Sequence, residues 1–335
     1  DAAVEFNGYY GLSDDGNFEG KNIPNLLHNK DAFENIQKNP LEDHRKKVFE
    51  AREKRIHPYK DDKVLTAWNG LMIAALSIGA RVLDNMEYAV PAERAVRFIR
   101  TKLIREDGRL LARYREGEAA YPGYLDDYAF LVWGLIELYE ATFKAEYLKL
   151  AADLNRDMLK YFYDEEKGGL FLYGSDSEQL IVRPKDVYDG AMPSGNSVAA
   201  MNFLRLGRLT GDTDLEDKAY KQLKAFGSII KSHPMGYTNM LSALLFINSK
   251  ASEIVIVGNR EDENAKRMIK SVNSHFNPFT VVLFKDNENV EEGITKIAAF
   301  TEEQIMIEDK ATAYICENHA CMAPITDLQE FENVL

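Results

Sequence analysis

Apolar residues in the middle of the chain recur with a helical period, and two kinds of helix alternate. One kind has an apolar stripe beside charged positions and is predicted at residues 41–55, 91–104, 145–161 and 214–231. The other is more apolar, rich in small residues, and predicted at 66–83, 125–142, 195–209 and 237–247. A helix that is apolar on most faces is buried on most faces. The alternation therefore predicts a mainly α fold, an α/α toroid in which four apolar helices form an inner ring inside four amphipathic ones.

The pattern changes after residue 250. Residues 252–258 and 279–284 are short apolar runs of the kind that forms buried strands, with a helix predicted between them at 261–275. Two strands joined by a helix pair in parallel. A third strand is predicted at 311–316 and a final helix at 327–334. The first strand is not followed by Gly-x-Gly-x-x-Gly, which argues against a dinucleotide site. The predicted domains are a connecting segment (1–40), toroid hairpins (41–250) and a small α/β tail (251–335).

Charge excludes some classes of partner. The chain has 54 acidic and 41 basic residues, a formal charge of -13, and no basic stripe. Binding to nucleic acid or an anionic membrane surface requires a local excess of Lys and Arg, so neither partner is expected. No apolar run approaches the ~20 residues that cross a bilayer. Residues 1–5 suit neither a signal peptide nor an initiator start, so a longer parent chain is expected.

A polar loop precedes each apolar helix, at residues 59–70, 121–128, 188–197 and 235–239. All four loops enter inner helices, so they should meet at one end of the toroid. Aromatic rings, amides and paired carboxylates at a cavity mouth suit a sugar, because carboxylates serve as acid and base. The predicted catalytic residues are Asp62, Asp127 and Asp189. The predicted substrate-binding residues are Asp61, Trp68, Asn69, Tyr124, Asp126, Tyr128, Ser194 and Asn196. No cofactor or metal is assigned.

The same residues also have a structural interpretation. Asp at the start of a helix usually caps it, a contribution of about 1 kcal/mol. Asp61, Asp126 and Asp189 stand at such positions, and Ser194 and Asn196 suit a cap with a tight helix approach. In the doublets Asp61-Asp62 and Asp126-Asp127, one carboxylate can cap while its neighbour remains for chemistry. Trp68 and Tyr128 suit packing as well as stacking.

Histidine and cysteine offer other chemistries. His57 precedes the first polar loop and His233 the fourth, and a neutral imidazole suits proton abstraction; a surface histidine is the alternative. Cys316, His319 and Cys321 supply at most three ligands, whereas a structural zinc site has four. The cysteine spacing is wide for a Cys-x-x-Cys redox pair. Two semi-buried thiols are therefore expected, with no disulfide framework, in a reducing cytoplasmic setting.

Several motifs occur together and in order: residues 16–22, 61–70, 124–129, 189–197 and 311–316. As a set they resemble the YyaL and spermatogenesis-associated protein 20 family. The resemblance implies a thioredoxin-like domain followed by a six-hairpin toroid similar to N-acylglucosamine 2-epimerases and six-hairpin glycosidases. This chain would then be the C-terminal portion, a partial (α/α)6 toroid whose open edges favour self-association.

The function expected from the resemblance and the rim loops is carbohydrate-related, as a glycoside hydrolase or a sugar epimerase. One departure is that no apolar helix here holds a histidine, whereas epimerases of that superfamily use histidines on inner helices. The alternative is a non-catalytic scaffold or sugar-binding module of a thioredoxin-domain-containing protein.

Overall fold

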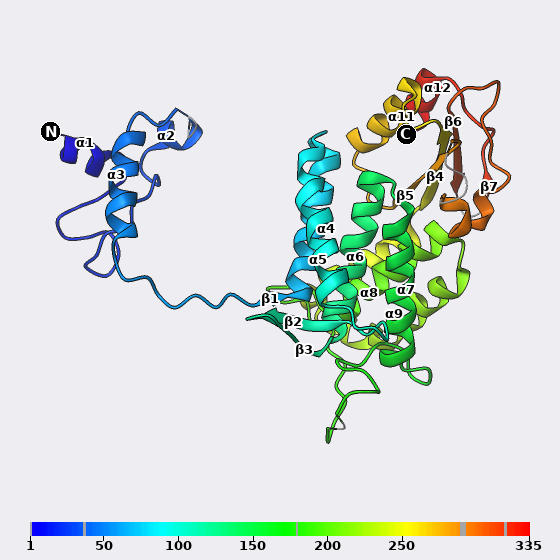
Figure 1. Cartoon of the computed structure of the whole chain (residues 1–335), viewed down its shortest axis with the longest axis horizontal. Helices are drawn as coiled ribbons and strands as arrows, with labels where there is room; N and C mark the ends of the chain where they lie inside the picture. The colour runs from blue at the N-terminus through cyan, green and yellow to red at the C-terminus, as the bar shows by residue number, and fades with distance from the viewer. Residues whose placement is uncertain (1, 36–37, 179, 289–292, 318–319) are drawn as a thin grey trace. The chain divides into compact units, whose positions relative to one another are not determined.

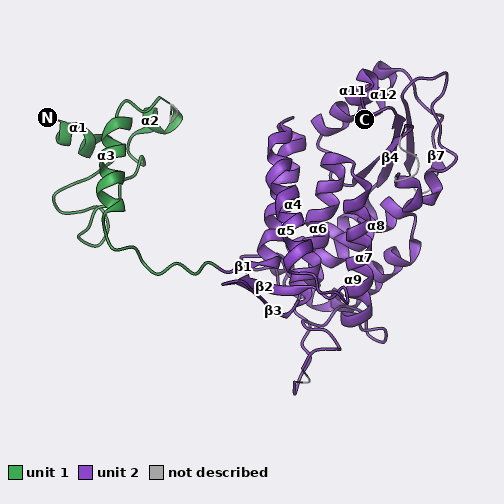
Figure 2. Ribbon diagram, in the orientation of Figure 1, with its two compact units in different colours: residues 1–62 green, residues 63–335 purple. Residues whose placement is uncertain are grey.

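The computed structural model describes residues 2–35, 38–178, 180–288, 293–317 and 320–335. The chain forms two compact units, Asp1–Asp62 and Lys63–Leu335 (Figure 2). No helix among the described residues is long and apolar enough to cross a membrane.

Unit 1 contains the helices α1 (Ala2–Tyr9), α2 (Lys30–Glu34) and α3 (Glu42–Glu53). The side chain of Asn17 organises the loop after α1, because it donates to the carbonyls of Gly11 and Ile23 and accepts from the N–H of Ile23. The charged helix predicted at 41–55 is confirmed as α3. Because α3 lies in unit 1, its pairing with the helix that begins at Thr66 stays a prediction.

Unit 2 begins with alternating apolar and amphipathic helices. The apolar helices are α4 (Thr66–Val82), α6 (Leu125–Thr142), α8 (Gly195–Thr210) and α10 (Thr238–Asn248). The amphipathic ones are α5 (Ala89–Lys102), α7 (Ala145–Phe162) and α9 (Thr213–Ser232). Short 3-10 helices, η2 (Met86–Tyr88) and η3 (Pro234–Gly236), precede α5 and α10. The predicted starts of the apolar helices are confirmed within one residue.

The apolar helices form a row in which α4 packs on α6, α6 on α8 and α8 on α10 (Figure 1). The amphipathic helices α5, α7 and α9 pack on α4, α6 and α8 respectively. Each of α4, α6 and α8 thus packs on the charged helix that follows it, whereas α10 is followed by β4. The alternation in the sequence predicts instead that each charged helix pairs with the apolar helix after it, and this prediction is wrong for α6 and α8. The predicted fold class is confirmed: the chain is mainly α, with an arc of α/α hairpins and a small C-terminal α/β segment.

Two glycines let α4 and α6 touch through their backbones. A Cβ on Gly70 would lie 2.5 Å from the carbonyl carbon of Phe130, and one on Gly134 would lie 2.6 Å from the carbonyl oxygen of Gly70. Helix α6 is buried along nearly its whole length. It is therefore the centre of the row, and its first turn is held firmly between its neighbours.

A small antiparallel sheet, not predicted from the sequence, lies beside the start of the row. Its strands are β1 (Val64–Leu65), β2 (Leu111–Arg115) and β3 (Glu118–Pro122), in that order. Glu116 and Gly117 form its turn with φ values of 52° and 85°. Two successive positive φ values match the right-handed twist of hairpin strands. The sheet joins the chain entering α4 to the chain entering α6.

The α/β tail is a four-stranded sheet in the order β5-β4-β6-β7. Its strands are β4 (Ser252–Gly258), β5 (Thr280–Asp286), β6 (Thr312–Glu317) and β7 (Ala320–Cys321), and its helices are α11 (Glu263–Ser274) and α12 (Leu328–Val334). Short 3-10 turns η4 (Ile294–Lys296) and η5 (Ala299–Thr301) follow β5. The predicted parallel pairing of β4 and β5 is confirmed, and β6 is antiparallel to β4.

The tail shares its core with the helices. Val255, Val257, Val281 and Leu283 belong to the same buried cluster as the helix side chains. The sequence pattern changes at residue 250, but the buried core is continuous across this point. The domain boundary predicted there therefore stays a prediction.

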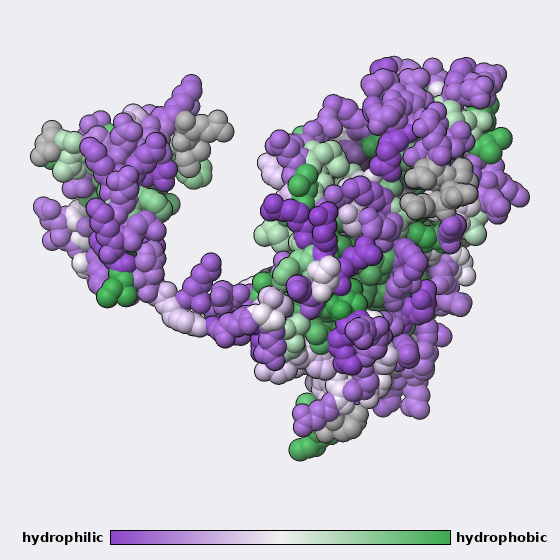
Figure 3. All heavy atoms as spheres, in the orientation of Figure 1, coloured by the Kyte–Doolittle hydropathy of each residue, from purple (hydrophilic) through white to green (hydrophobic). Residues whose placement is uncertain are grey.

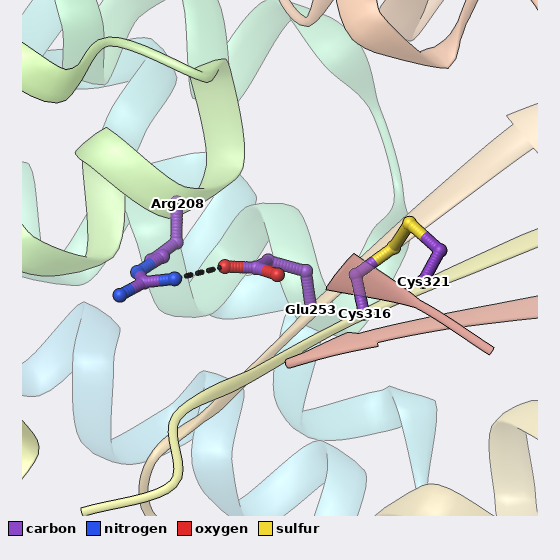
Figure 4. Close-up of a disulfide and its surroundings, with 4 residues drawn as sticks. All are labelled: Arg208, Glu253, Cys316 and Cys321. Atoms are coloured by element: carbon purple, nitrogen blue, oxygen red, sulfur yellow. Dashed lines mark hydrogen bonds and ion pairs between the residues drawn. A yellow bond between two sulfur atoms is a disulfide. The ribbon is translucent and has the colours of Figure 1, made fainter. Parts of the chain in front are cut away.

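The expectation of two unbonded thiols is wrong. Cys316 on β6 lies opposite Cys321 on β7, and the two form a disulfide (Figure 4). On the adjacent strand, Glu253 is the register partner of Cys316 and forms an ion pair with Arg208 of α8. The antiparallel hairpin brings the two cysteines together despite their separation in sequence. His319, considered as a zinc ligand, lies outside the described residues, and the cytoplasmic location stays a prediction.

Candidate functional site: the rim formed by the starts of the apolar helices

Asp127 connects the first turns of α6 and α4. One of its oxygens accepts a hydrogen bond of 2.9 Å from the backbone N–H of Tyr124, the N-cap residue of α6. The other accepts a 2.9 Å bond from the N–H of Ala67 in α4. The first N–H groups of a helix have no partner inside the helix, and an acceptor there stabilises the helix. The carboxylate thus caps two helices at once.

Burial, with a smaller contribution from the charge of Asp126, raises the pKa of Asp127 to about 7, although the two backbone hydrogen bonds lower it. The side chain is almost fully buried. The buried carboxyl group of Asp127 therefore changes its protonation state near neutral pH.

Asp126 connects α6 to its other neighbour. Its carboxylate accepts a hydrogen bond from the N–H of Gly195 at the start of α8. A Cβ on Gly195 would lie 2.4 Å from an oxygen of Asp126, so only glycine permits this approach. Burial raises the pKa of Asp126 and the nearby charge of Asp186 raises it further, while the Gly195 hydrogen bond lowers it. Asp126 is partly exposed, unlike Asp127.

Asp189 connects α8 to α10. One oxygen accepts from the N–H of Ser194, the N-cap residue of α8, at 2.9 Å. The other accepts from Asn239 at 2.9 Å and Met240 at 3.2 Å, in the first turn of α10. Ser194 itself accepts from the N–H of Ser197. The cap of α8 is therefore Ser194, and Asp189, expected at that cap, caps α10 instead.

Asn196 and Tyr128 lie inside the protein, each 0% exposed. The amide of Asn196 bonds both the N–H and the carbonyl of Leu170 and donates to the carbonyl of Asp186. The hydroxyl of Tyr128 accepts from the N–H of Leu110 at 3.0 Å. Both side chains thus position the loops behind the rim.

The aromatic side chains at the rim are exposed. Trp68, Tyr124 and Tyr188 are 59%, 46% and 62% exposed. Trp68 follows Ala67 in the chain, Tyr124 donates its N–H to Asp127, and Tyr188 directly precedes Asp189. Tyr188 packs edge-on against Tyr237, with ring centroids 6.3 Å apart. The side-chain amide of Asn69 donates to the carbonyl of Leu65, the N-cap residue of α4. The rim is the set of first turns of α4, α6, α8 and α10, together with these exposed aromatic side chains and the carboxylates of Asp126, Asp127 and Asp189.

Sequence reasoning missed Tyr188 and Asp186. Tyr188 directly precedes Asp189 in the third polar loop, so its place in that loop was the signal available. Asp186 lies just outside the loop, and only the fold brings its charge near Asp126.

Asp61, Asp62 and His57 belong to unit 1, so their position relative to the rim is not defined. His233 is exposed and its ring contacts the hydroxyl of Ser232. The catalytic roles predicted for Asp62, Asp127 and Asp189 stay predictions. Among the residues that the structure describes, no group of three or more His, Cys, Asp or Glu side chains is placed to hold a metal ion.

Comparisons place the chain among known proteins. The fold defines it as an α/α-hairpin protein, and no family model matches its sequence. It is 35% identical over 299 residues to spermatogenesis-associated protein 20 of Homo sapiens, covering 86% of this chain and 38% of that protein. It is 26% identical over 350 residues to an uncharacterised protein of Caenorhabditis elegans, covering 99% of this chain and 47% of that protein. Over the matched residues the chain belongs to the spermatogenesis-associated protein 20 family, and it spans less than half the length of these relatives.

Among solved structures, the chain is similar to a sugar epimerase from a ruminal bacterium, with a TM-score of 0.44 and 20% identity over 52% of this chain and 46% of that one. It is also similar to the cellobiose 2-epimerase of Bacillus thermoamylovorans, with a TM-score of 0.43 and 14% identity over 79% of this chain and 67% of that one. With TM-scores below 0.5, these likenesses add nothing to the fold and site described above.

Proposed function

We propose that the rim binds carbohydrate and that Asp126 is its acid/base group, for hydrolysis or epimerisation of a sugar. One observation carries the proposal. Three exposed aromatic side chains, Trp68, Tyr124 and Tyr188, lie at or just before the starts of α4, α6 and α8, and the first turn of α6 carries Asp126, a partly exposed carboxyl group whose pKa is raised. Aromatic faces stack on sugar rings, and an acid with a raised pKa suits proton transfer near neutral pH.

Asp126 takes the acid/base role in this proposal because the other rim carboxylates are occupied. Both oxygens of Asp127 accept backbone N–H groups, and so do both oxygens of Asp189. These two residues hold the helix ends in register. Asp186, exposed and close enough to raise the pKa of Asp126, is the second carboxylate available to a substrate.

The second candidate is a sugar-binding module without catalysis. The observation in its favour is that Asp126, like the other two carboxylates, also bonds a helix N–H. Binding without turnover would support this candidate, and turnover would exclude it.

Binding and turnover with a panel of mono- and disaccharides test the proposal. Trp68→Ala should weaken sugar binding by roughly tenfold or more, equivalent to about 1.4 kcal/mol. Tyr220→Ala is the matched control, because Tyr220 is a similarly exposed aromatic on α9, away from the rim. Asp126→Asn should retain binding and reduce turnover by roughly 10²- to 10⁴-fold. Equal binding by the Trp68 and Tyr220 variants, or no sugar binding by the unaltered chain, would contradict the proposal.

Self-association across the two ends of the row is also a proposal. The end helices expose apolar side chains, among them Met72 on α4 and Leu245 on α10. Apolar side chains also show among the helices of unit 2 in the space-filling view (Figure 3). Sedimentation of the chain over a range of concentrations distinguishes monomer from dimer.

A further inference from the structure

A cavity of about 1110 Å³ lies away from the rim, where the row of helices meets the α/β tail. It is bounded by α7, the C-terminal end of α8, the start of α9, the segment after β4, the end of β5, and η4. This volume is slightly above the roughly 300–1000 Å³ typical of ligand sites. Arg260, which follows β4, and Asp286, the last residue of β5, line the cavity, so it lies at the carboxyl ends of these two parallel strands. Crevices at such ends commonly bind ligands.

The start of α7 faces this cavity without a side-chain cap. This helix has 18 residues and begins at Ala145, and its N-cap residue Lys144 makes no side-chain capping bond. The N-terminal N–H groups of a helix and its dipole favour an anion. The preceding residue, Phe143, has φ of 51°, a left-handed conformation that is rare for a bulky side chain. Phe143 is the C-cap residue of α6, and a left-handed residue commonly ends a helix.

The charges around the cavity leave one cation available. Lys296 lines the cavity and forms no ion pair with any residue that the structure describes. Three of the four acidic side chains of the lining have cationic partners: Asp153 with Lys149 and Arg156, Glu146 with Arg100, and Asp286 with Arg260. The fourth, Asp212, accepts a hydrogen bond from the N–H of Asp214 at the start of α9. An anion entering the cavity therefore meets three paired carboxylates, Asp212, and an ammonium group that pairs with none of the described residues, in a chain whose formal net charge is -13.

Asn155 supplies an independent observation. It lies on α7, lines the cavity and is only 2% exposed. Its side-chain oxygen has no hydrogen-bond partner within the described part of the chain. A buried acceptor without a partner costs roughly 1–3 kcal/mol. A ligand hydroxyl that donates to Asn155 would remove this cost.

We propose that the cavity binds a small hydroxylated anion, with its phosphate or carboxylate group at the start of α7 beside Lys296 and a hydroxyl donating to Asn155. The anion and the hydroxyl are recognised by different groups, so each contributes separately to affinity. This site is independent of the rim and of the function proposed there.

Titration at low ionic strength with defined probes tests the site, because salt screens such contacts. The probes are inorganic phosphate, glycerol 3-phosphate, glycerate and glycerol, followed by the chemical shifts of amides lining the cavity. We expect glycerol 3-phosphate to bind more tightly than inorganic phosphate, and glycerol not to bind. Comparison of glycerate with glycerol 3-phosphate shows which anionic group the site prefers.

Two variants separate the parts of the site. Lys296→Ala should weaken anion binding by roughly tenfold, whereas Lys231→Ala, an exposed lysine at the end of α9, should leave it unchanged. Asn155→Leu should bind inorganic phosphate normally and lose the advantage of glycerol 3-phosphate. The proposal is overturned if no anion shifts the cavity amides, or if Lys296→Ala and Lys231→Ala bind equally well. Because Lys296 is exposed, its replacement leaves the fold intact even where Asn155→Leu does not.

Discussion

The carboxylate of Asp127, in the first turn of α6, accepts a 2.9 Å hydrogen bond from the backbone N–H of Ala67 in the first turn of α4. Its neighbour Asp126 does the same in the opposite direction, toward Gly195 of α8. Asp189 extends the series to α10 through Asn239. The starts of the apolar helices are thus joined in a row by carboxylates. These hydrogen bonds hold the first turns of the helices in place, and with them the exposed aromatic side chains that those turns carry.

The ionisation of Asp127 gives stability a characteristic pH dependence. The pKa of this carboxyl group is about 7 in the folded chain against an ordinary value of 3.8, so the folded state holds the proton more tightly. Its contribution is complete below about pH 4 and is lost as the pH rises to about 7, by up to roughly 4 kcal/mol. Urea unfolding at several pH values measures this fall.

Asp127→Asn is the control for that dependence. Asn cannot ionise, so the fall in unfolding free energy between about pH 4 and 7 should become clearly smaller. The variant should also be less stable overall by about 1–3 kcal/mol, because the amide nitrogen cannot accept a backbone N–H. An identical pH dependence in the two proteins would show that Asp127 does not titrate in this range.

Two glycines of α4 should respond oppositely to alanine. In Gly70→Ala the new Cβ would lie 2.5 Å from backbone of α6, so we expect a loss of about 1–3 kcal/mol or more. In Gly79→Ala nothing lies within 4 Å, and the variant should gain up to about 1 kcal/mol from helix propensity. Denaturant midpoints of the two variants give the comparison. Equal midpoints would mean that α4 and α6 are not in backbone contact.

A buried ion network connects the middle of the row. Arg205 of α8 pairs with Glu137 and Glu140 of α6, and Arg81 of α4 pairs with the same two carboxylates. Arg205→Met leaves two buried carboxylates with one cation and should cost about 3–5 kcal/mol.

The exposed pair of Lys270 and Asp84 provides the control for the ion network. Lys270→Met should change stability by no more than about 1 kcal/mol, because both partners are in water. Equal losses of stability in Arg205→Met and Lys270→Met would contradict the stabilising role of the buried network.

The disulfide predicts the reactivity of the cysteines. Under non-reducing conditions neither Cys316 nor Cys321 should react with a thiol reagent, and both should react after reduction. The bond closes a short loop, so its loss should cost only about 2 kcal/mol. Mass spectrometry of the labelled chain counts the modified cysteines. Rapid labelling of both cysteines without reductant would contradict the bond.

The sequence was sufficient to locate the apolar helices, because their starts combine a polar loop with a change to an apolar period, as at Thr66 and Leu125. It was not sufficient to assign the partners of the rim carboxylates. An Asp at a helix start indicates a helix cap. Only the packing of α4 on α6 shows that Asp127 caps the neighbouring helix as well as its own. The hairpin at Glu116 and Gly117 lacks the Asn-Gly signal of such turns. The disulfide depends on strand pairing, which spacing alone does not specify.

The most direct test of the carbohydrate proposal is to map sugar binding on the chain by amide chemical shifts during titration with a saccharide panel. The account predicts that at least one sugar shifts the amides of Trp68, Tyr124, Asp126 and Tyr188 together, and that these shifts disappear in Trp68→Ala but persist in Tyr220→Ala. Shifts confined to other parts of unit 2, or none with any sugar, would contradict it.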